Sequence, residues 1–192
     1  MTDTGSGLRH APSMSTEVLK ALANPLRRQV WNEVTRARYA RAADLAQRLD
    51  QPANTLSFHL RVLAQAGLIE EAPERARDKR DRVWKPTSGA MSLGSPEDPV
   101  ADQILGSAVM AGFIDDARSL LTRVANWAGS YVTGEDATER GVYTTATLRL
   151  SRERFIALID QLDQVVTSFR DDPEDDETLT WELSMIGASE EI

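Results

Sequence analysis

Cysteine is absent from this chain of 192 residues, and histidine occurs only twice, as His10 and His59. Without cysteine the chain forms no disulfide and offers no thiolate for metal binding or redox sensing, so the cytoplasm is the expected compartment. Transition-metal sites use three or four nitrogen or sulfur ligands, which two histidines cannot supply. We therefore expect neither a metal ion nor any other cofactor.

Long hydrophobic runs are missing as well, and so are the common catalytic patterns. No segment reaches the roughly 18 apolar residues that a membrane-spanning helix needs, so we expect no membrane contact. Residues 1–13 lack the apolar core of a secretory signal and are expected to form a disordered tail. The chain has no nucleophile–histidine–carboxylate set and no glycine-rich phosphate loop, which predicts that it is not an enzyme.

The net charge of −8 is divided unevenly between the two halves of the chain. Residues 1–94 hold 15 Lys and Arg against 10 Asp and Glu, a net of +5, whereas residues 95–192 hold 7 against 20, a net of −13. A basic module attracts the phosphates of nucleic acid, while an acidic module is repelled by them. The N-terminal half is therefore the expected site of any contact with DNA.

Helix signals divide the N-terminal third into short helices. Ser15 or Thr16 can cap the first helix, and Asn24-Pro25 offers a second cap followed by proline at the first helical position. A third helix is expected at 42–49. Pro52 can begin a helix but cannot continue one, so a turn precedes a fourth helix at 53–66.

The helix expected at 53–66 has two different faces. At 100° per residue, Leu56, Leu60 and Leu63 form one apolar stripe, which predicts the buried side. The other side carries polar, aromatic and cationic residues, namely Asn54, Thr55, Ser57, Phe58 and Arg61.

Two short strands, 68–71 and 82–85, are expected after this helix. The loop between them, residues 73–82, is basic and contains Arg75, Arg77, Lys79 and Arg80. A short helix, a tight turn, a second helix with a polar face and a basic hairpin together predict a winged helix-turn-helix domain over residues 14–90.

A family pattern runs through LKALANPLRRQVWNEV and AADLAQRLDQPANTLSFHLRVLAQAGLIEEA. The second segment places Ser57, His59, Leu60, Leu63 and Ala66-Gly67-Leu68 at the spacing Ser-x-His-Leu-x-x-Leu-x-x-Ala-Gly-Leu. In these positions residues 15–88 resemble the ArsR family of bacterial winged-helix repressors. Two positions depart from the family pattern, since Asp50 stands where the turn usually has Gly and Pro52 where a Ser cap is common. Both residues are compatible with a turn.

The resemblance implies that the polar face of the fourth helix enters the major groove of duplex DNA. Arg61 suits a guanine edge or a phosphate, and Asn54 suits an adenine edge, whereas Thr55 and Ser57 flank them. The four basic wing residues would contact phosphates or the minor groove. The alternative for the wing is a solvated charged loop.

Two residues of the same helix have more than one interpretation. Phe58 would pack on a thymine methyl group, or it is a partly buried surface aromatic residue. His59 lies at the edge of the apolar stripe, where an imidazole more often packs and forms local hydrogen bonds than binds a ligand.

The C-terminal half begins with an expected linker at 91–98, followed by one long helix at 99–131. Its apolar residues recur at steps of three and four and are expected to pair with the same helix of a second chain. The alternative is an internal core helix. The expected dimer contacts are Leu105, Val109, Phe113, Leu120 and Val124.

Residues 142–150 and 178–186 alternate apolar and polar side chains, which predicts two strands. An amphipathic helix beginning near Ser151 lies between them, so a small β-α-β unit with parallel strands is expected. Residues 99–192 would then form a dimerisation and effector domain. Four aromatic residues either line a pocket for a small apolar or aromatic effector or are core residues: Trp127, Tyr131, Tyr143 and Trp181.

The expected fold class is α+β and mainly α. It combines the winged helix-turn-helix with a long dimerisation helix and the small β-α-β domain. The expected function is that of a homodimeric, sequence-specific DNA-binding transcription regulator acting as a repressor. The alternative is a winged helix used for protein–protein contact without DNA.

Overall fold

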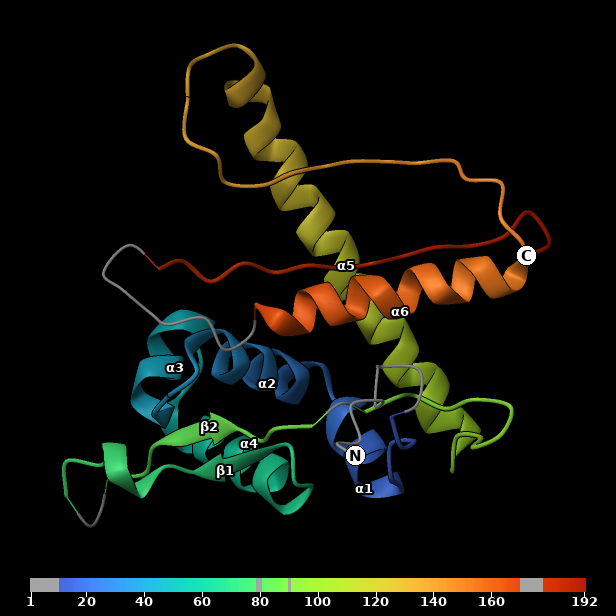
Figure 1. Ribbon diagram of the computed structural model, residues 1–192. Helices are drawn as coiled ribbons and strands as arrows, with labels where there is room; N and C mark the ends of the chain where they lie inside the picture. Colours follow the sequence, from blue (N-terminus) through green and yellow to red (C-terminus); the bar gives the residue numbers. More distant parts are fainter. Residues whose placement is uncertain (1–10, 79–80, 90, 170–177) are drawn as a thin grey trace.

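A computed structural model describes residues 11–78, 81–89, 91–169 and 178–192. Within these ranges the chain is mainly helical with one two-stranded sheet (Figure 1). The elements are α1 (Thr16–Leu22), α2 (Pro25–Ala37), α3 (Ala42–Leu49), α4 (Ala53–Gln65), β1 (Ile69–Glu71), η2 (Pro73–Arg75), β2 (Trp84–Pro86), α5 (Gln103–Val132) and α6 (Arg152–Ser168). No helix in the described ranges is long and apolar enough to cross a membrane.

Side-chain caps explain where most of these helices begin. Ser15 Oγ accepts a hydrogen bond from the backbone N–H of Val18 at the start of α1, and Asn24 Oδ1 accepts one from Arg27 at the start of α2. Asp102 caps α5 in the same way, so this helix begins at Gln103 and not at residue 99. The helices predicted at 42–49 and 53–66 are confirmed within one residue.

The core of the N-terminal domain lies between α1, α2, α3, α4 and the hairpin. β1 pairs antiparallel with β2, so that Ile69 lies opposite Pro86. A single bridge between Ala40 and Trp84 adds the loop before α3 to this sheet. The predicted winged helix-turn-helix arrangement of helices and hairpin is therefore present.

The turn between α3 and α4 depends on a left-handed residue. Asp50 has φ 49° and ψ 49°, a conformation that glycine adopts most easily and that Asp and Asn tolerate better than other residues. This tolerance explains why aspartate can stand at this position of the turn without disrupting it.

Residues 11–13 and the expected linker 91–98 are packed against each other, so the prediction of a disordered tail was wrong for residues 11–13. Ala11 is buried, Met14 donates a backbone hydrogen bond to Ser92, and Ser13 bonds to Asp98 through its backbone N–H and its hydroxyl. The chain between β2 and α5 is therefore attached to the N-terminal domain. The remainder of the predicted tail, residues 1–10, lies outside the described residues.

The first half of α5 packs on the N-terminal domain of its own chain. Val109 is fully buried in the shared core, and Leu105 and Phe113 pack against that core. Assigning Val109 to a dimer contact was therefore wrong, and Leu105 and Phe113 are already partly buried by the core of their own chain. Only the alternative of an internal core helix describes this half of α5.

A buried arginine holds α5 against α2. Arg28 of α2 is 7% exposed, and its Nε lies 3.0 Å from Asp116 Oδ2 of α5. Asn32 Nδ2 donates to the same oxygen at 3.1 Å. Gly112 leaves the space that the Arg28 guanidinium occupies, because a Cβ at this position would overlap it. Charge pairing and the absence of one side chain thus fix the angle at which α5 leaves the domain.

The small β-α-β unit predicted for the C-terminal half is not formed within the chain. α6 is present, but residues 142–150 and 178–186 belong to no strand and run as two drawn-out segments (Figure 1). The alternating side chains predicted the extended conformation, whereas a strand also needs a backbone partner. Among the described residues, neither segment has a paired strand.

Gly112→Ala tests the contact between α5 and α2. The new methyl group displaces Arg28 from Asp116, so we expect the free energy of unfolding to fall by about 1–2 kcal/mol despite the better helix propensity of alanine. Gly129→Ala in the same helix is the control, because no atom lies within 4 Å of its added Cβ. That variant should gain about 0.5–1 kcal/mol. Urea unfolding that finds both variants equally stabilised would contradict this account of the contact.

Candidate nucleic-acid interface

The outward face of α4 gathers most of the predicted DNA-contacting side chains on one surface. Leu56, Leu60 and Leu63 are fully buried on the inner side of the helix. The opposite side is left to solvent, with Asn54 and Arg61 exposed and Phe58 53% exposed. Thr55 and Ser57 are half-buried at its margins. The half-exposed ring of Phe58 fits both of its interpretations, so the contact with a thymine methyl stays a prediction.

Arg61 is held by its own helix while its charge stays accessible. Its Nε donates to the backbone carbonyl of Ser57 at 3.2 Å, one turn earlier. The Ser57 hydroxyl donates in turn to the carbonyl of Ala53 at 2.8 Å. These local bonds do not use either terminal nitrogen of the Arg61 guanidinium. An exposed guanidinium in this state can bind two acceptor atoms at once.

The wing begins with the single turn η2 and is fastened at its base by Asp81. Both carboxylate oxygens of Asp81 lie 3.0 Å from Arg41 Nε, and the backbone N–H of Arg77 donates to Oδ2 at 2.9 Å. The bond from Arg77, followed by those from Arg41, lowers the pKa of Asp81. Asp81 therefore stays ionised and ties the loop to the N-terminus of α3.

The predicted wing cations have different surroundings. Arg75 lies over the ring of Tyr39, with Cζ 4.7 Å from the ring centroid, and its carbonyl accepts a bond from Arg41. Arg77 is exposed. Lys79 and Arg80 lie outside the described residues. Arg75 and Arg77 thus lie in the wing, while the placement of Lys79 and Arg80 at its tip stays a prediction.

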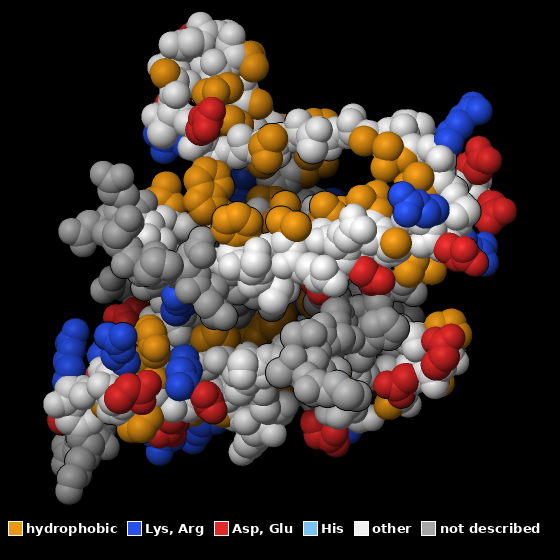
Figure 2. Space-filling model, viewed as in Figure 1, with side chains coloured by type: hydrophobic (Ala, Val, Ile, Leu, Met, Phe, Trp, Pro, Cys, Tyr) orange, Lys and Arg blue, Asp and Glu red, His pale blue; other side chains and the backbone are white. Residues whose placement is uncertain are grey.

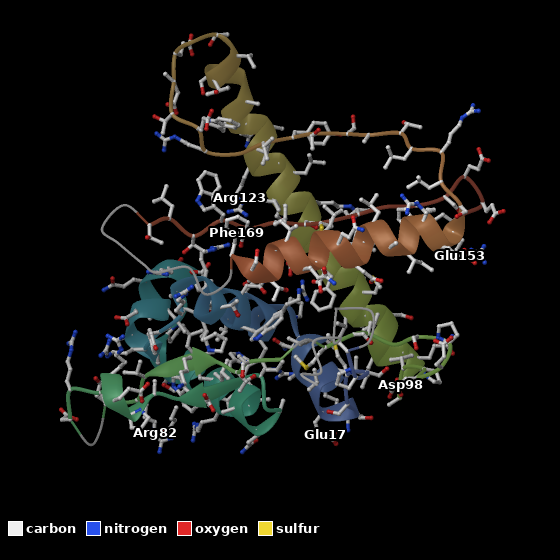
Figure 3. The ribbon with its side chains drawn as sticks, in the orientation of Figure 1. Glu17, Arg82, Asp98, Arg123, Glu153 and Phe169 are labelled. Carbon is white, nitrogen blue, oxygen red and sulfur yellow. The ribbon has the colours of Figure 1, made fainter. Side chains whose placement is uncertain are left out.

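Two further arginines join this surface that the sequence analysis did not single out. A hollow of about 420 Å³ lies between α3, α4 and the hairpin, lined by Arg41, Ala42, Ala43, Ser57, Arg61, Asp81, Arg82 and Trp84. Arg82 lies at the foot of the hairpin (Figure 3), 60% exposed and 3.4 Å from Glu71. The sequence held one signal for Arg82: it directly precedes the apolar pair Val83-Trp84, which is buried in the structure. Arg41 gave no comparable signal, because only the fold brings it beside Ser57 and Arg61.

His59 is buried on the inner side of α4. It is 8% exposed, its ring meets Phe58 edge-on at 5.5 Å between centroids, and Nδ1 has no hydrogen-bond partner among the described residues. Burial lowers the pKa of His59, and the nearby positive charge of Arg27 lowers it further. The histidine therefore serves packing, and its charged form is unfavourable in the folded state.

The four aromatic residues considered for an effector pocket form no common group in the structure. Trp127 and Tyr131 lie with their ring centroids 4.7 Å apart and their planes tilted by 36°, and Trp127 Nε1 donates to the carbonyl of Thr138. Tyr143 and Trp181 are 70% and 61% exposed. Neither of the two described hollows, which lie at the wing, contains any of the four. An effector pocket at this position stays a prediction.

The lowered pKa of His59 predicts a pH-dependent stability. As pH falls below about 6.5, the unfolded chain takes up a proton at this residue before the folded chain does, so stability present above that pH is lost. The loss can reach about 1.4 kcal/mol per pH unit from this group. Urea unfolding of wild type and His59→Gln between about pH 7.5 and 5.5 measures the contribution. Equal slopes in the two proteins would contradict it.

Comparison with known families agrees with this geometry. Residues 22–72 match a family model described as a helix-turn-helix domain. No curated protein matches the chain. The matched segment covers the end of α1, the whole of α2, α3 and α4, and β1. Residues 22–72 are therefore a helix-turn-helix domain, the kind of domain with which transcription regulators bind DNA.

Proposed function

We propose that this protein is a sequence-specific DNA-binding transcription regulator of the ArsR type that residues 15–88 resemble. The observation that carries the proposal is the outward face of α4, where Arg61 stands exposed with Arg41 and Arg82 beside it. α4 would enter the major groove, with Arg61 and Asn54 contacting base edges. Arg75, Arg77 and Arg82 would contact phosphates beside it or the minor groove.

The chief alternative is a winged helix that serves only protein–protein contact. Such a surface is usually apolar at its centre and poor in charge. The face described above is instead mostly polar and cationic around the single aromatic Phe58. This composition favours a polyanionic partner. We also propose that the protein acts in the cytoplasm as a repressor and catalyses no reaction.

A homodimer is part of the proposal, since a single winged helix covers too few base pairs for useful specificity. The surface that α5 offers differs from the one expected from its sequence. Its outer seam consists of Met110, Ile114, Ala117, Leu121 and Val124, which recur at steps of four and three. Met110, Ile114 and Leu121 are 45%, 45% and 52% exposed, so these three residues remain largely uncovered in a single chain, whereas Ala117 and Val124 are half-buried.

Arg61→Ala tests base contact by α4. Loss of a bidentate contact to guanine should weaken binding to a selected operator by about 1–3 kcal/mol and relax the preference for that sequence. Arg118→Ala is a matched control, since Arg118 is 74% exposed on α5, away from the interface. Gel shifts with operator and scrambled duplexes measure both effects. Equal losses in the two variants would contradict a role of Arg61 in base contact.

Asp81→Asn distinguishes two effects on DNA affinity: the position of the wing and the net charge of the surface. Removing a carboxylate beside DNA should strengthen binding if only net charge matters. The structure predicts the opposite, because Asp81 holds Arg41 and the backbone of Arg77 in place. We expect affinity to fall by roughly threefold to tenfold, the range of one lost ordinary hydrogen bond. Tighter binding by the variant would show that the wing needs no such support.

Leu121→Glu tests the outer seam of α5. A charge at the centre of an apolar contact should dissociate the dimer, while the N-terminal domain stays folded, because Leu121 is not part of its core. Ser119→Glu is the control. It adds the same charge at an exposed position of α5 that does not belong to the outer seam. Sedimentation velocity should find a monomer for the first variant and a dimer for the second. Two dimeric variants would exclude this seam as the contact.

A further inference from the structure

Much apolar surface of the C-terminal half has no cover in a single chain. In residues 178–186 the alternate side chains Leu179, Trp181 and Leu183 are 67%, 61% and 65% exposed. Their neighbours face the chain itself, since the Thr180 hydroxyl donates to the carbonyl of Arg36 and Glu182 pairs with Arg36 and Arg123. One side of this segment is thus attached, and the other presents a row of large apolar side chains.

The extended segments 142–150 and 178–186 run side by side in the same direction. Gly141, at the start of the first, lies against Val124 and Trp127 of α5, and Glu182 of the second pairs with Arg123 one turn away. At their far ends the first runs into Ser151, the cap of α6, and Gly187 lies against Phe155 of the same helix. Figure 1 shows both segments crossing α5. Along the chain, α6 lies between them and runs back in the opposite direction.

The two segments are nevertheless not joined to each other. No backbone hydrogen bond connects them among the described residues. Figure 2 shows an open gap between the upper segment and the rest of the molecule, and hydrophobic side chains line it. Closing this gap within the chain would give a two-stranded parallel sheet, a form that is rarely stable unless helices cover both faces.

A second copy of the chain is the occupant that the observations favour. Thirteen large hydrophobic residues between positions 142 and 186 are at least 38% exposed, an area on the order of 1,000 Å², more than soluble monomers usually present. This amount is what one partner contributes to a stable interface. Residues 142–169 and 178–186 hold three Arg against four Asp and Glu, so two copies of this surface repel each other little.

We propose that an extended segment of a second copy enters the gap, so that the two chains build one sheet between them. A twofold axis places the inserted segment antiparallel to both of its neighbours. The result is a four-stranded antiparallel sheet with two strands from each chain, and α6 of each chain packs on it. This proposal rests on the homodimer proposed above and assigns to it a second contact, separate from the outer seam of α5.

Hydrogen exchange at two protein concentrations tests the shared sheet. In the wild-type dimer the amides of 142–150 and 178–186 should exchange more than roughly tenfold slower than free peptide, and dilution to the monomer should remove that protection. Helices α2 and α4 should stay protected at both concentrations. Fast exchange of the two segments in the dimer overturns the proposal, as does protection that persists in the monomer, which would indicate pairing within one chain.

Single proline substitutions give an independent measurement. The backbone N–H groups of successive strand residues point to opposite edges of the strand, and proline has no N–H. One of the two variants Ala146→Pro and Thr147→Pro must therefore remove a hydrogen bond to the strand of the second chain. At least one of them should raise the dimer dissociation constant more than roughly tenfold. Ala137→Pro, in the loop before the segment, is the control and should leave it unchanged.

These experiments need no DNA, so their outcome is separate from the test of DNA binding. A sedimentation dimer in which neither proline variant dissociates more readily overturns the shared sheet and leaves the homodimer standing. A wild-type protein that remains monomeric overturns both. A protected, concentration-dependent sheet in a protein that fails to bind any duplex supports the inference and rejects the proposed function.

Discussion

Burial of the leucine stripe of α4 is the constraint on which the interface depends. Leu56, Leu60 and Leu63 are all fully buried against α1, α2 and α3, and burying each such side chain contributes about 1.5–3 kcal/mol. The helix can therefore not rotate about its axis without exposing them. Successive side chains are rotated by 100° about the helix axis, so their relative directions are fixed. When the leucine stripe points inward, Asn54, Phe58 and Arg61 therefore point outward.

The same core extends to α5 and so connects the two halves of the chain. Val109 belongs to the core that α4 completes, and the Arg28–Asp116 pair joins α2 to α5 about two turns further along. Glu182 then reaches the end of α2 from the C-terminal segment by pairing with Arg36. A change in the C-terminal half thus has two physical connections to the helix-turn-helix domain, one through α5 and one through Arg36.

Local signals in the sequence predicted the N-terminal domain well. Caps such as Ser15 and Asn24 and the period of the leucines act within a few residues, so helix boundaries could be derived without knowledge of the fold. The contribution of Arg41 to the interface could not, because it depends on a contact with Asp81, 40 residues away. The packing of Leu105 and Phe113 was missed for the same reason. An apolar stripe predicts burial but does not identify what covers it.

Salt dependence of binding to duplex DNA tests the proposed role of this surface most directly. If two copies of the chain contact roughly 6–10 phosphates, affinity for an operator selected from genomic fragments should fall by about 10³–10⁵ between about 50 and 200 mM salt. Fluorescence anisotropy with labelled duplex measures this slope. Retention of no duplex at low salt, or an affinity that does not change with salt, would contradict DNA binding through the cationic face of α4 and the wing.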